Sequence, residues 1–129
     1  MNDLHLLSHP HSDERGTLHV VEPGDLPFTP ARVFWISHVP EGQTRGGHAH
    51  RTCAEAIFAL QGSVQITVDD ALQPPHTYTL DSPRQGLHIP PNVWCHLHHF
   101  SADALLLVLA SEPYRPDGYV HDYEHFRHG

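Results

Sequence analysis

The chain has 129 residues, a length that suits one domain with a single hydrophobic core, and we therefore expect residues 1–129 to form one domain. Its formal net charge of -8 argues against nucleic acid or an anionic membrane surface as a main partner. All 7 basic residues are arginine, which excludes Schiff-base catalysis by a lysine amine.

Short β-strands separated by turns are predicted along almost the whole chain. The predicted strands are rich in β-branched and aromatic residues and are bounded by glycine or proline. They lie at 17–22, 32–39, 55–60, 63–69, 76–80, 86–89, 94–99 and 104–110. The C-terminal segment 116–129 is compatible with a helical turn or with an extended chain. The close spacing of the strands indicates an all-β sandwich or small barrel.

Targeting and cysteine signals are weak in this sequence. No apolar stretch approaches the length needed to span a bilayer, so no membrane partner is expected. The first residues lack a basic segment followed by an apolar one, so we expect no secretory signal and a cytoplasmic protein. Cys53 and Cys95 lie far apart and are expected to be free thiols.

Histidines, a glutamate and two glycines form a spaced set between residues 42 and 62: Gly42, His48, His50, Glu55 and Gly62. This spacing resembles the first sequence motif of the cupin superfamily, which implies a jelly-roll fold (double-stranded β-helix). Residues two apart on a strand point to the same face, so both imidazoles should project together into the barrel. With 15 histidines in the chain, the alternative is a pair that arises from composition alone.

The same resemblance raises the question of a metal ion. Metal-binding cupins complete a set of His, His and Glu with a last histidine from a second motif. The matching place here is Cys95, whereas His96 is one residue further and should face the other way in a regular strand. We therefore expect no metal and no cofactor, although a shifted register or a Cys95 thiolate would still complete a site.

A closer resemblance covers nearly the whole chain. The segments 13–22, 32–50, 60–70, 87–94 and 107–126 are similar, in order, to the nucleotide-sugar 3,4-ketoisomerases of the cupin superfamily. This resemblance implies a metal-independent isomerase that moves the carbonyl of dTDP-4-keto-6-deoxy-D-glucose from C4 to C3 through an enediol. It also implies that His48 and His50 are the acid and the base. Which histidine has which role, and the C4 configuration of the product, are left open.

Four further residues are candidates for substrate binding. Arg45 precedes the histidine pair and is the expected cation near the pyrophosphate or the sugar oxygens. Glu55 is expected to orient a histidine. Trp35 and Trp94 are candidates for stacking or for lining the cavity, with core packing as the alternative. The family often has a tyrosine near Trp35, where this chain has none, so no tyrosine role is assigned.

The resemblance to this family implies a dimer whose two copies exchange N-terminal strands. The predicted strand 17–22 is followed by the Pro- and Gly-containing segment 23–30, which is long enough to reach a neighbouring copy. We therefore expect a homodimer. Three alternatives to the ketoisomerase remain: a metal-dependent cupin such as a dioxygenase, an epimerase of a related nucleotide sugar, and a non-catalytic module that binds nucleotide sugars.

Overall fold

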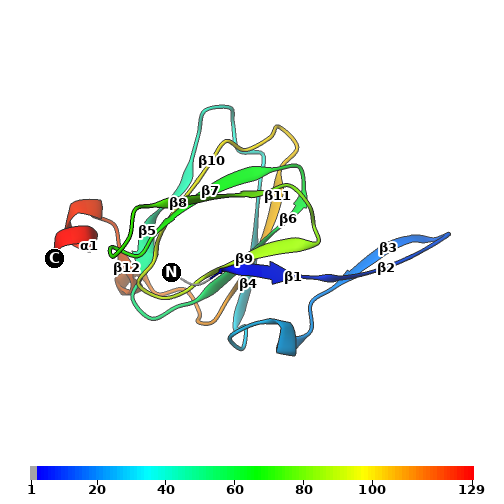
Figure 1. Ribbon diagram of the computed structural model, residues 1–129, viewed down its shortest axis with the longest axis horizontal. Helices are drawn as coiled ribbons and strands as arrows, with labels where there is room; N and C mark the ends of the chain where they lie inside the picture. The colour runs from blue at the N-terminus through cyan, green and yellow to red at the C-terminus, as the bar shows by residue number, and fades with distance from the viewer. Residues whose placement is uncertain (1–2) are drawn as a thin grey trace.

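Two five-stranded antiparallel sheets face each other in the computed structural model, which describes residues 3–129 (Figure 1). The first sheet contains, in spatial order, β1 (His5–Leu7), β9 (Gln85–Ile89), β6 (Glu55–Gln61), β11 (Leu105–Ala110) and β4 (Arg32–Ser37). The second contains β12 (Tyr119–Val120), β5 (Arg45–His50), β10 (Trp94–His98), β7 (Val64–Asp69) and β8 (His76–Leu80). This arrangement confirms the predicted all-β jelly roll.

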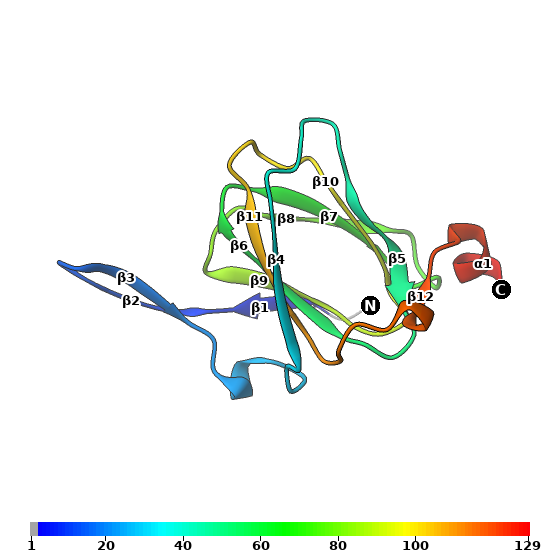
Figure 2. The same cartoon turned by 180° about the vertical axis from the view of Figure 1, so that it is seen from behind.

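A separate hairpin lies outside the two sheets. It pairs β2 (His9–Asp13) with β3 (Gly16–Val20), and it points away from the body of the protein (Figure 1). One short 3-10 turn, Pro23–Asp25, follows β3, and another, Pro116–Gly118, precedes β12. Seen from behind, the hairpin and the C-terminal helix lie at opposite ends of the molecule (Figure 2).

The core fills the space between the two sheets because inward-facing residues alternate with outward-facing ones. On β7, Val64, Ile66 and Val68 are fully buried, while the residues between them are partly exposed. Leu106 and Val108 of β11 meet them from the other sheet in the same hydrophobic cluster. Burial of each such side chain stabilises the fold by roughly 1.5–3 kcal/mol.

The turn between β6 and β7 depends on a glycine. Gly62 has a φ of +71°, as the sequence predicts. A Cβ at this position would lie 2.2 Å from the hydroxyl oxygen of Ser101. Any other residue would therefore be strained and would also collide with the segment before β11.

The C-terminal segment forms the helix α1 (Tyr123–His128), the helical alternative of the prediction. Asp122 caps the helix by accepting a hydrogen bond from the backbone N–H of His125. Buried Asp69 accepts hydrogen bonds from the Tyr123 hydroxyl and from Arg127 Nη1, the latter at 2.5 Å. These bonds attach α1 to the end of β7. Among residues 3–129, no helix is long and apolar enough to cross a bilayer.

Candidate active site

The two histidines of the spaced motif lie side by side on β5 and face the interior between the sheets. Their ring centroids are 4.9 Å apart and their planes are nearly perpendicular, at 87°. His50 is only 6% exposed, and His48, but not His50, lines a cavity between the sheets. The expectation that both imidazoles project to the same side is confirmed.

Gly46 allows β5 to place these histidines close to β10. Its φ is +80°, and a Cβ there would lie 2.8 Å from the carbonyl oxygen of Cys95 and 3.2 Å from Leu97 Cδ1. The pairing of the two strands shifts register between Cys95 and His96, directly opposite this point. A glycine is therefore required at this close approach of the two backbones.

Glu55 faces the histidines from β6 in the opposite sheet. Its Oε1 lies 3.4 Å from Nε2 of His50, and both side chains are buried. The contact is close enough for an ion pair, but its geometry is not that of a hydrogen bond, and His50 Nε2 has no hydrogen-bond partner among the described residues. A buried nitrogen without a hydrogen bond destabilises the protein by about 1–3 kcal/mol. A ligand that hydrogen-bonds to His50 Nε2 would remove this penalty and bind more tightly for that reason.

Burial controls the charge of two groups in the site. Desolvation, assisted by the neighbouring charge of His50, lowers the pKa of His48 to about 4, so this imidazole is neutral at neutral pH. Burial also raises the pKa of Tyr119, whose phenol therefore remains protonated at neutral pH. The site thus holds a neutral imidazole next to a neutral phenol.

The cavity has a volume of about 260 Å³ and lies between β4 of one sheet and β5 of the other. Two cations line it, Arg32 from β4 and Arg45 from β5. The Arg32 guanidinium lies over the rings of Phe34, at 4.5 Å, and Tyr114, at 5.4 Å. These aromatic contacts hold the guanidinium in place. The cavity is thus able to accept an anionic ligand next to the imidazole of His48.

The residues present also fit a divalent metal ion. The ligand atoms of His48, His50 and Glu55 lie within 4.8 Å of one another, a His₂-carboxylate set that suits zinc or iron. The unsatisfied nitrogen of His50 is consistent with such an ion, as it is with a substrate oxygen. Cys95 is buried opposite His48 on β10, but burial and the Glu55 carboxylate raise its pKa, so it is a neutral thiol rather than a thiolate.

His96 does not join this set. It is partly exposed on the outer side of β10, and its ring stacks on His98 with a centroid distance of 5.2 Å. The expected orientation away from the histidine pair is confirmed. The expectation that Cys53 and Cys95 are free thiols is confirmed as well.

The two tryptophans lie outside the cavity, so neither is positioned to line it within this chain. Trp35 is 67% exposed because it alternates with inward-facing Phe34 and Ile36 on β4. Trp94 packs against Tyr123 and Phe126 of α1, at centroid distances of 5.2 and 5.7 Å. Trp94 thus has the packing role named as its alternative, and Trp35 contributes to an exposed outer face.

Three charged or hydroxyl-bearing residues in the cavity have no role in the sequence-based assignment: Arg32, Tyr114 and Tyr119. Tyr119 is placed there by β12, a strand of two residues whose pairing aligns Tyr119 with His50. Both tyrosines belong to the C-terminal segment that resembles the family, but a strand so short has no periodic pattern to reveal it. The resemblance marks the segment, while only the fold shows that it reaches the histidines.

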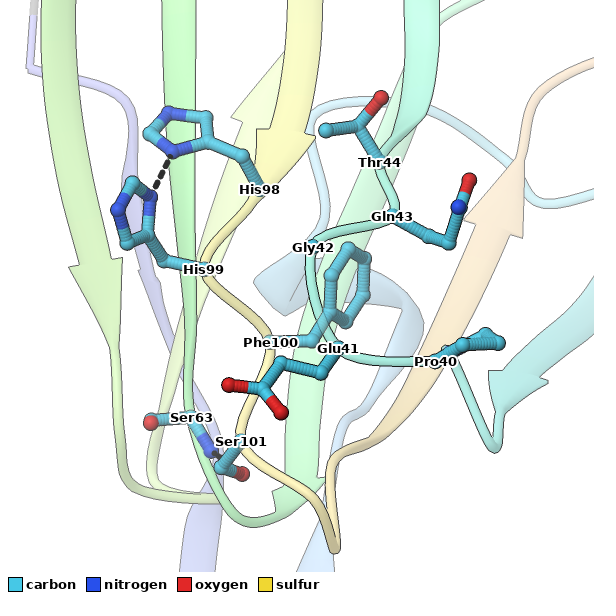
Figure 3. Close-up of a pocket in the computed structure, with 10 residues that line it drawn as sticks. All are labelled: Pro40, Glu41, Gly42, Gln43, Thr44, Ser63, His98, His99, Phe100 and Ser101. Atoms are coloured by element: carbon cyan, nitrogen blue, oxygen red, sulfur yellow. Dashed lines mark hydrogen bonds between the residues drawn. The ribbon is translucent and has the colours of Figure 1, made fainter.

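A second cavity, of about 470 Å³, lies at the loop 40–44 and the end of β10 (Figure 3). His98 and His99 border it, with their Nδ1 atoms 2.6 Å apart. It shares no lining residue with the cavity of His48. We therefore do not assign the paired-histidine chemistry to it.

A jelly roll whose interior holds two adjacent imidazoles and a carboxylate defines a cupin-type protein. The chain belongs to the WxcM-like, C-terminal family (FdtA), whose sequence model matches residues 2–129. It is similar to the TDP-4-oxo-6-deoxy-alpha-D-glucose-3,4-oxoisomerase of Aneurinibacillus thermoaerophilus. The two are 36% identical over 118 residues, which cover 89% of this chain and 83% of that protein.

Solved structures agree with this assignment. The sugar 3,4-ketoisomerase QdtA from Thermoanaerobacterium thermosaccharolyticum, in complex with TDP, has a TM-score of 0.90 and 32% identity over 95% of this chain and 90% of its own. The TDP-fucose-3,4-ketoisomerase WlaRA from Campylobacter jejuni has a TM-score of 0.91 and 30% identity over 98% of this chain and 94% of its own. A 4-keto-6-deoxy sugar epimerase from Streptomyces spheroides is more distant, with 20% identity and a TM-score of 0.76 over 89% of this chain and 66% of its own. This likeness shows a shared fold alone.

Proposed function

We propose that this protein is a sugar 3,4-ketoisomerase that converts dTDP-4-keto-6-deoxy-D-glucose into a dTDP-3-keto-6-deoxyhexose. The observation that carries the proposal is the pair of adjacent imidazoles, His48 and His50, beside a cavity lined by two arginines. The oxoisomerase from Aneurinibacillus thermoaerophilus is named for this sugar, and the related QdtA binds TDP.

The reaction needs two pairs of proton transfers, one pair to form an enediol and one to resolve it, and no external oxidant. The ketone at C4 acidifies the hydrogen on C3, which a base removes while an acid protonates O4, and an enediol results. Loss of the proton from O3 and return of a proton to C4 then leave the carbonyl at C3. One proton leaves carbon and one returns to it, so atoms and electrons balance within the sugar.

His48 and His50 share these acid and base roles. The neutral imidazole of His48 has a free lone pair that can accept a proton, because burial lowers its pKa to about 4. His50 lies at the next inward position of β5, so both rings can face one sugar. Glu55, whose carboxylate is 3.4 Å from His50 Nε2, orients that imidazole.

The diphosphate of the substrate is held by arginine. Arg45 and Arg32 line the cavity from two different strands, and guanidinium groups bind phosphate oxygens through paired N–H donors. This local positive charge offsets the net charge of -8, which by itself would repel a nucleotide. The exposed position of Trp35 gives it no part in this binding within one chain.

We propose that turnover needs no metal, since hydrogen bonds can hold the oxygens of the enediol. Were an ion to bind, His48, His50 and Glu55 would hold it, and it would polarise the sugar oxygens. Metal analysis of protein purified without a histidine tag separates the two cases. A stoichiometric ion whose removal abolishes turnover would favour the metal-dependent alternative.

We also propose that the protein is a homodimer, with N-terminal strands exchanged between the two copies. The hairpin of β2 and β3 extends from the body (Figure 2), and Leu18 on it is 64% exposed. Val33 and Trp35, on the edge strand β4 of the first sheet, are 52% and 67% exposed. A second copy would cover these apolar side chains and the open sheet edge. The cytoplasmic location stays a prediction.

Incubation with dTDP-4-keto-6-deoxy-D-glucose, followed by ¹³C NMR, tests the proposed activity. We expect the carbonyl signal to move from C4 to C3, with a double variant, His48→Asn with His50→Asn, as the inactive control. A folded wild-type protein that leaves the sugar unchanged would contradict the ketoisomerase. In that case, binding of the sugar nucleotide without turnover would favour the non-catalytic module.

A further inference from the structure

The strand β4 contributes no phenol to the cavity. Its inward-facing residues are Arg32, Phe34 and Ile36, whereas Trp35 and Ser37 face outward and are exposed. The phenols that line the cavity come instead from the C-terminal segment, as Tyr114 and Tyr119. A hydroxyl donor for a sugar oxygen would therefore have to come from this segment.

Tyr119 contacts both imidazoles. Its ring centroid lies 4.8 Å from that of His48 and 4.5 Å from that of His50. The pairing of β12 with β5 fixes this position, because Tyr119 is aligned with His50 in the register. A sugar that reaches both histidines must therefore lie beside Tyr119. Tyr114, in contrast, is 60% exposed and packs on Arg32.

Arg32 lies close to Tyr119 in the same cavity. Its positive charge favours the ionised phenol and so opposes the effect of burial on the pKa of Tyr119. A guanidinium carries only hydrogen-bond donors, so Arg32 cannot accept the hydrogen of the phenol, which stays available to a ligand. Arg32 is itself held between the rings of Phe34 and Tyr114. The Tyr119 hydroxyl can therefore donate a hydrogen bond to a ligand in the cavity that His48 also lines.

We infer that Tyr119 is a further catalytic residue, whose hydroxyl donates a hydrogen bond to the sugar oxygen that becomes negatively charged as the C3 proton leaves. This inference rests on the proposed ketoisomerase function. The hydrogen stays on the phenol oxygen, and the two histidines still carry the protons. A donor that the fold holds in place acts on the transition state more than on the bound substrate, and loss of one such donor lowers kcat by about 10²- to 10³-fold.

The test compares Tyr119→Phe with Tyr78→Phe. The first keeps the ring against both imidazoles and removes only the hydroxyl. The second removes a phenol oxygen on β8, outside the cavity. We expect kcat of Tyr119→Phe to fall by about 10²-fold or more with little change in KM, and Tyr78→Phe to match the wild type. Exchange of the C3 hydrogen in deuterated water should fall in the same proportion as kcat.

The outcomes separate this inference from the proposed function. An active wild type together with an unchanged kcat in Tyr119→Phe would overturn the role of the hydroxyl and leave the ketoisomerase intact. A raised KM with unchanged kcat would also overturn it, because it would show uniform substrate binding instead. An inactive wild type would overturn the function and this inference together. Circular dichroism confirms that each variant is folded.

Discussion

Two neighbouring imidazoles are the residues on which the proposed chemistry depends most. We expect His48→Asn and His50→Asn each to lower kcat by about 10²- to 10⁴-fold, the usual contribution of a general acid or base. Asparagine retains polarity and approximate size, so the fold should persist. His96→Asn is the matched control, because His96 lies on the outer side of β10. Near-normal turnover in both active-site variants would remove these histidines from the mechanism.

Burial of His48 also makes stability depend on pH. Its pKa is about 4 in the folded protein against 6.5 for an ordinary histidine, so between these values the unfolded chain binds a proton that the folded protein does not. The free energy of unfolding should therefore decrease as pH falls from 6.5 towards 4. Because His48 is only partly buried, we expect a loss of about 1–2 kcal/mol.

Denaturant unfolding of the wild type and of His48→Asn, at pH 7.5 and at pH 4.5, measures this effect. The wild type should lose more free energy of unfolding on acidification than the variant does. The difference between the two proteins isolates His48 from the other histidines of the chain. An equal loss in both proteins would show that His48 is not desolvated in the folded state.

The spacing of residues in the sequence predicts only some of the residues of the site. The pattern of two histidines one residue apart fixes a shared face, and the structure confirms it for His48 and His50. It does not show which face of β4 is the inner one, so Trp35 is a candidate in the sequence while Arg32 lines the cavity. Tyr119 is missed because its position comes from long-range pairing of β12 with β5.

The strand β5 positions the histidines through Gly46, and the neighbouring Gly47 provides a comparison. Gly46 and Gly47 both have positive φ, +80° and +74°, but only at Gly46 would a Cβ collide with the backbone of β10. We expect Gly47→Ala to show the backbone strain alone, about 1–2 kcal/mol. Gly46→Ala should show the same strain plus displacement of β5, with lower stability and lower turnover.

Thermal unfolding and kcat of both glycine variants measure this difference. If Gly46→Ala and Gly47→Ala prove equally stable and equally active, the close approach of β5 to β10 does not position the histidines. The same comparison tests the irregular register between Cys95 and His96, which lies opposite Gly46.

Predicted and observed strands agree best where apolar residues alternate. The strands 63–69 and 104–110 correspond to β7 and β11, with ends that differ by a residue. β1 and β2, in contrast, lie in a His-, Ser- and Pro-containing segment without such a pattern, and they form because β1 pairs with β9 and β2 with β3. Local sequence does not encode pairing partners that are distant in the chain.

The hairpin of β2 and β3 projects from the body of the protein (Figure 2) and carries an exposed apolar side chain, Leu18. If it packs on a second copy, size-exclusion chromatography with light scattering should give twice the mass of one chain. Leu18→Asp should weaken this dimer, because Leu18 is an exposed apolar residue of the hairpin, at 64%. Leu72→Asp is the matched control, an exposed leucine outside the strands. A wild type that remains monomeric at micromolar concentration would contradict the dimer.

The proposed function depends most on proton transfer through an enediol without a metal. Its most direct test incubates chelator-treated, untagged protein with dTDP-4-keto-6-deoxy-D-glucose in deuterated water and follows the sugar by NMR. We expect a 3-keto product with deuterium at C4, whose coupling constants give the C4 configuration. If the folded, metal-free protein forms no product and exchanges no hydrogen at C3, and activity returns only when a metal ion is added, the metal-free mechanism is wrong.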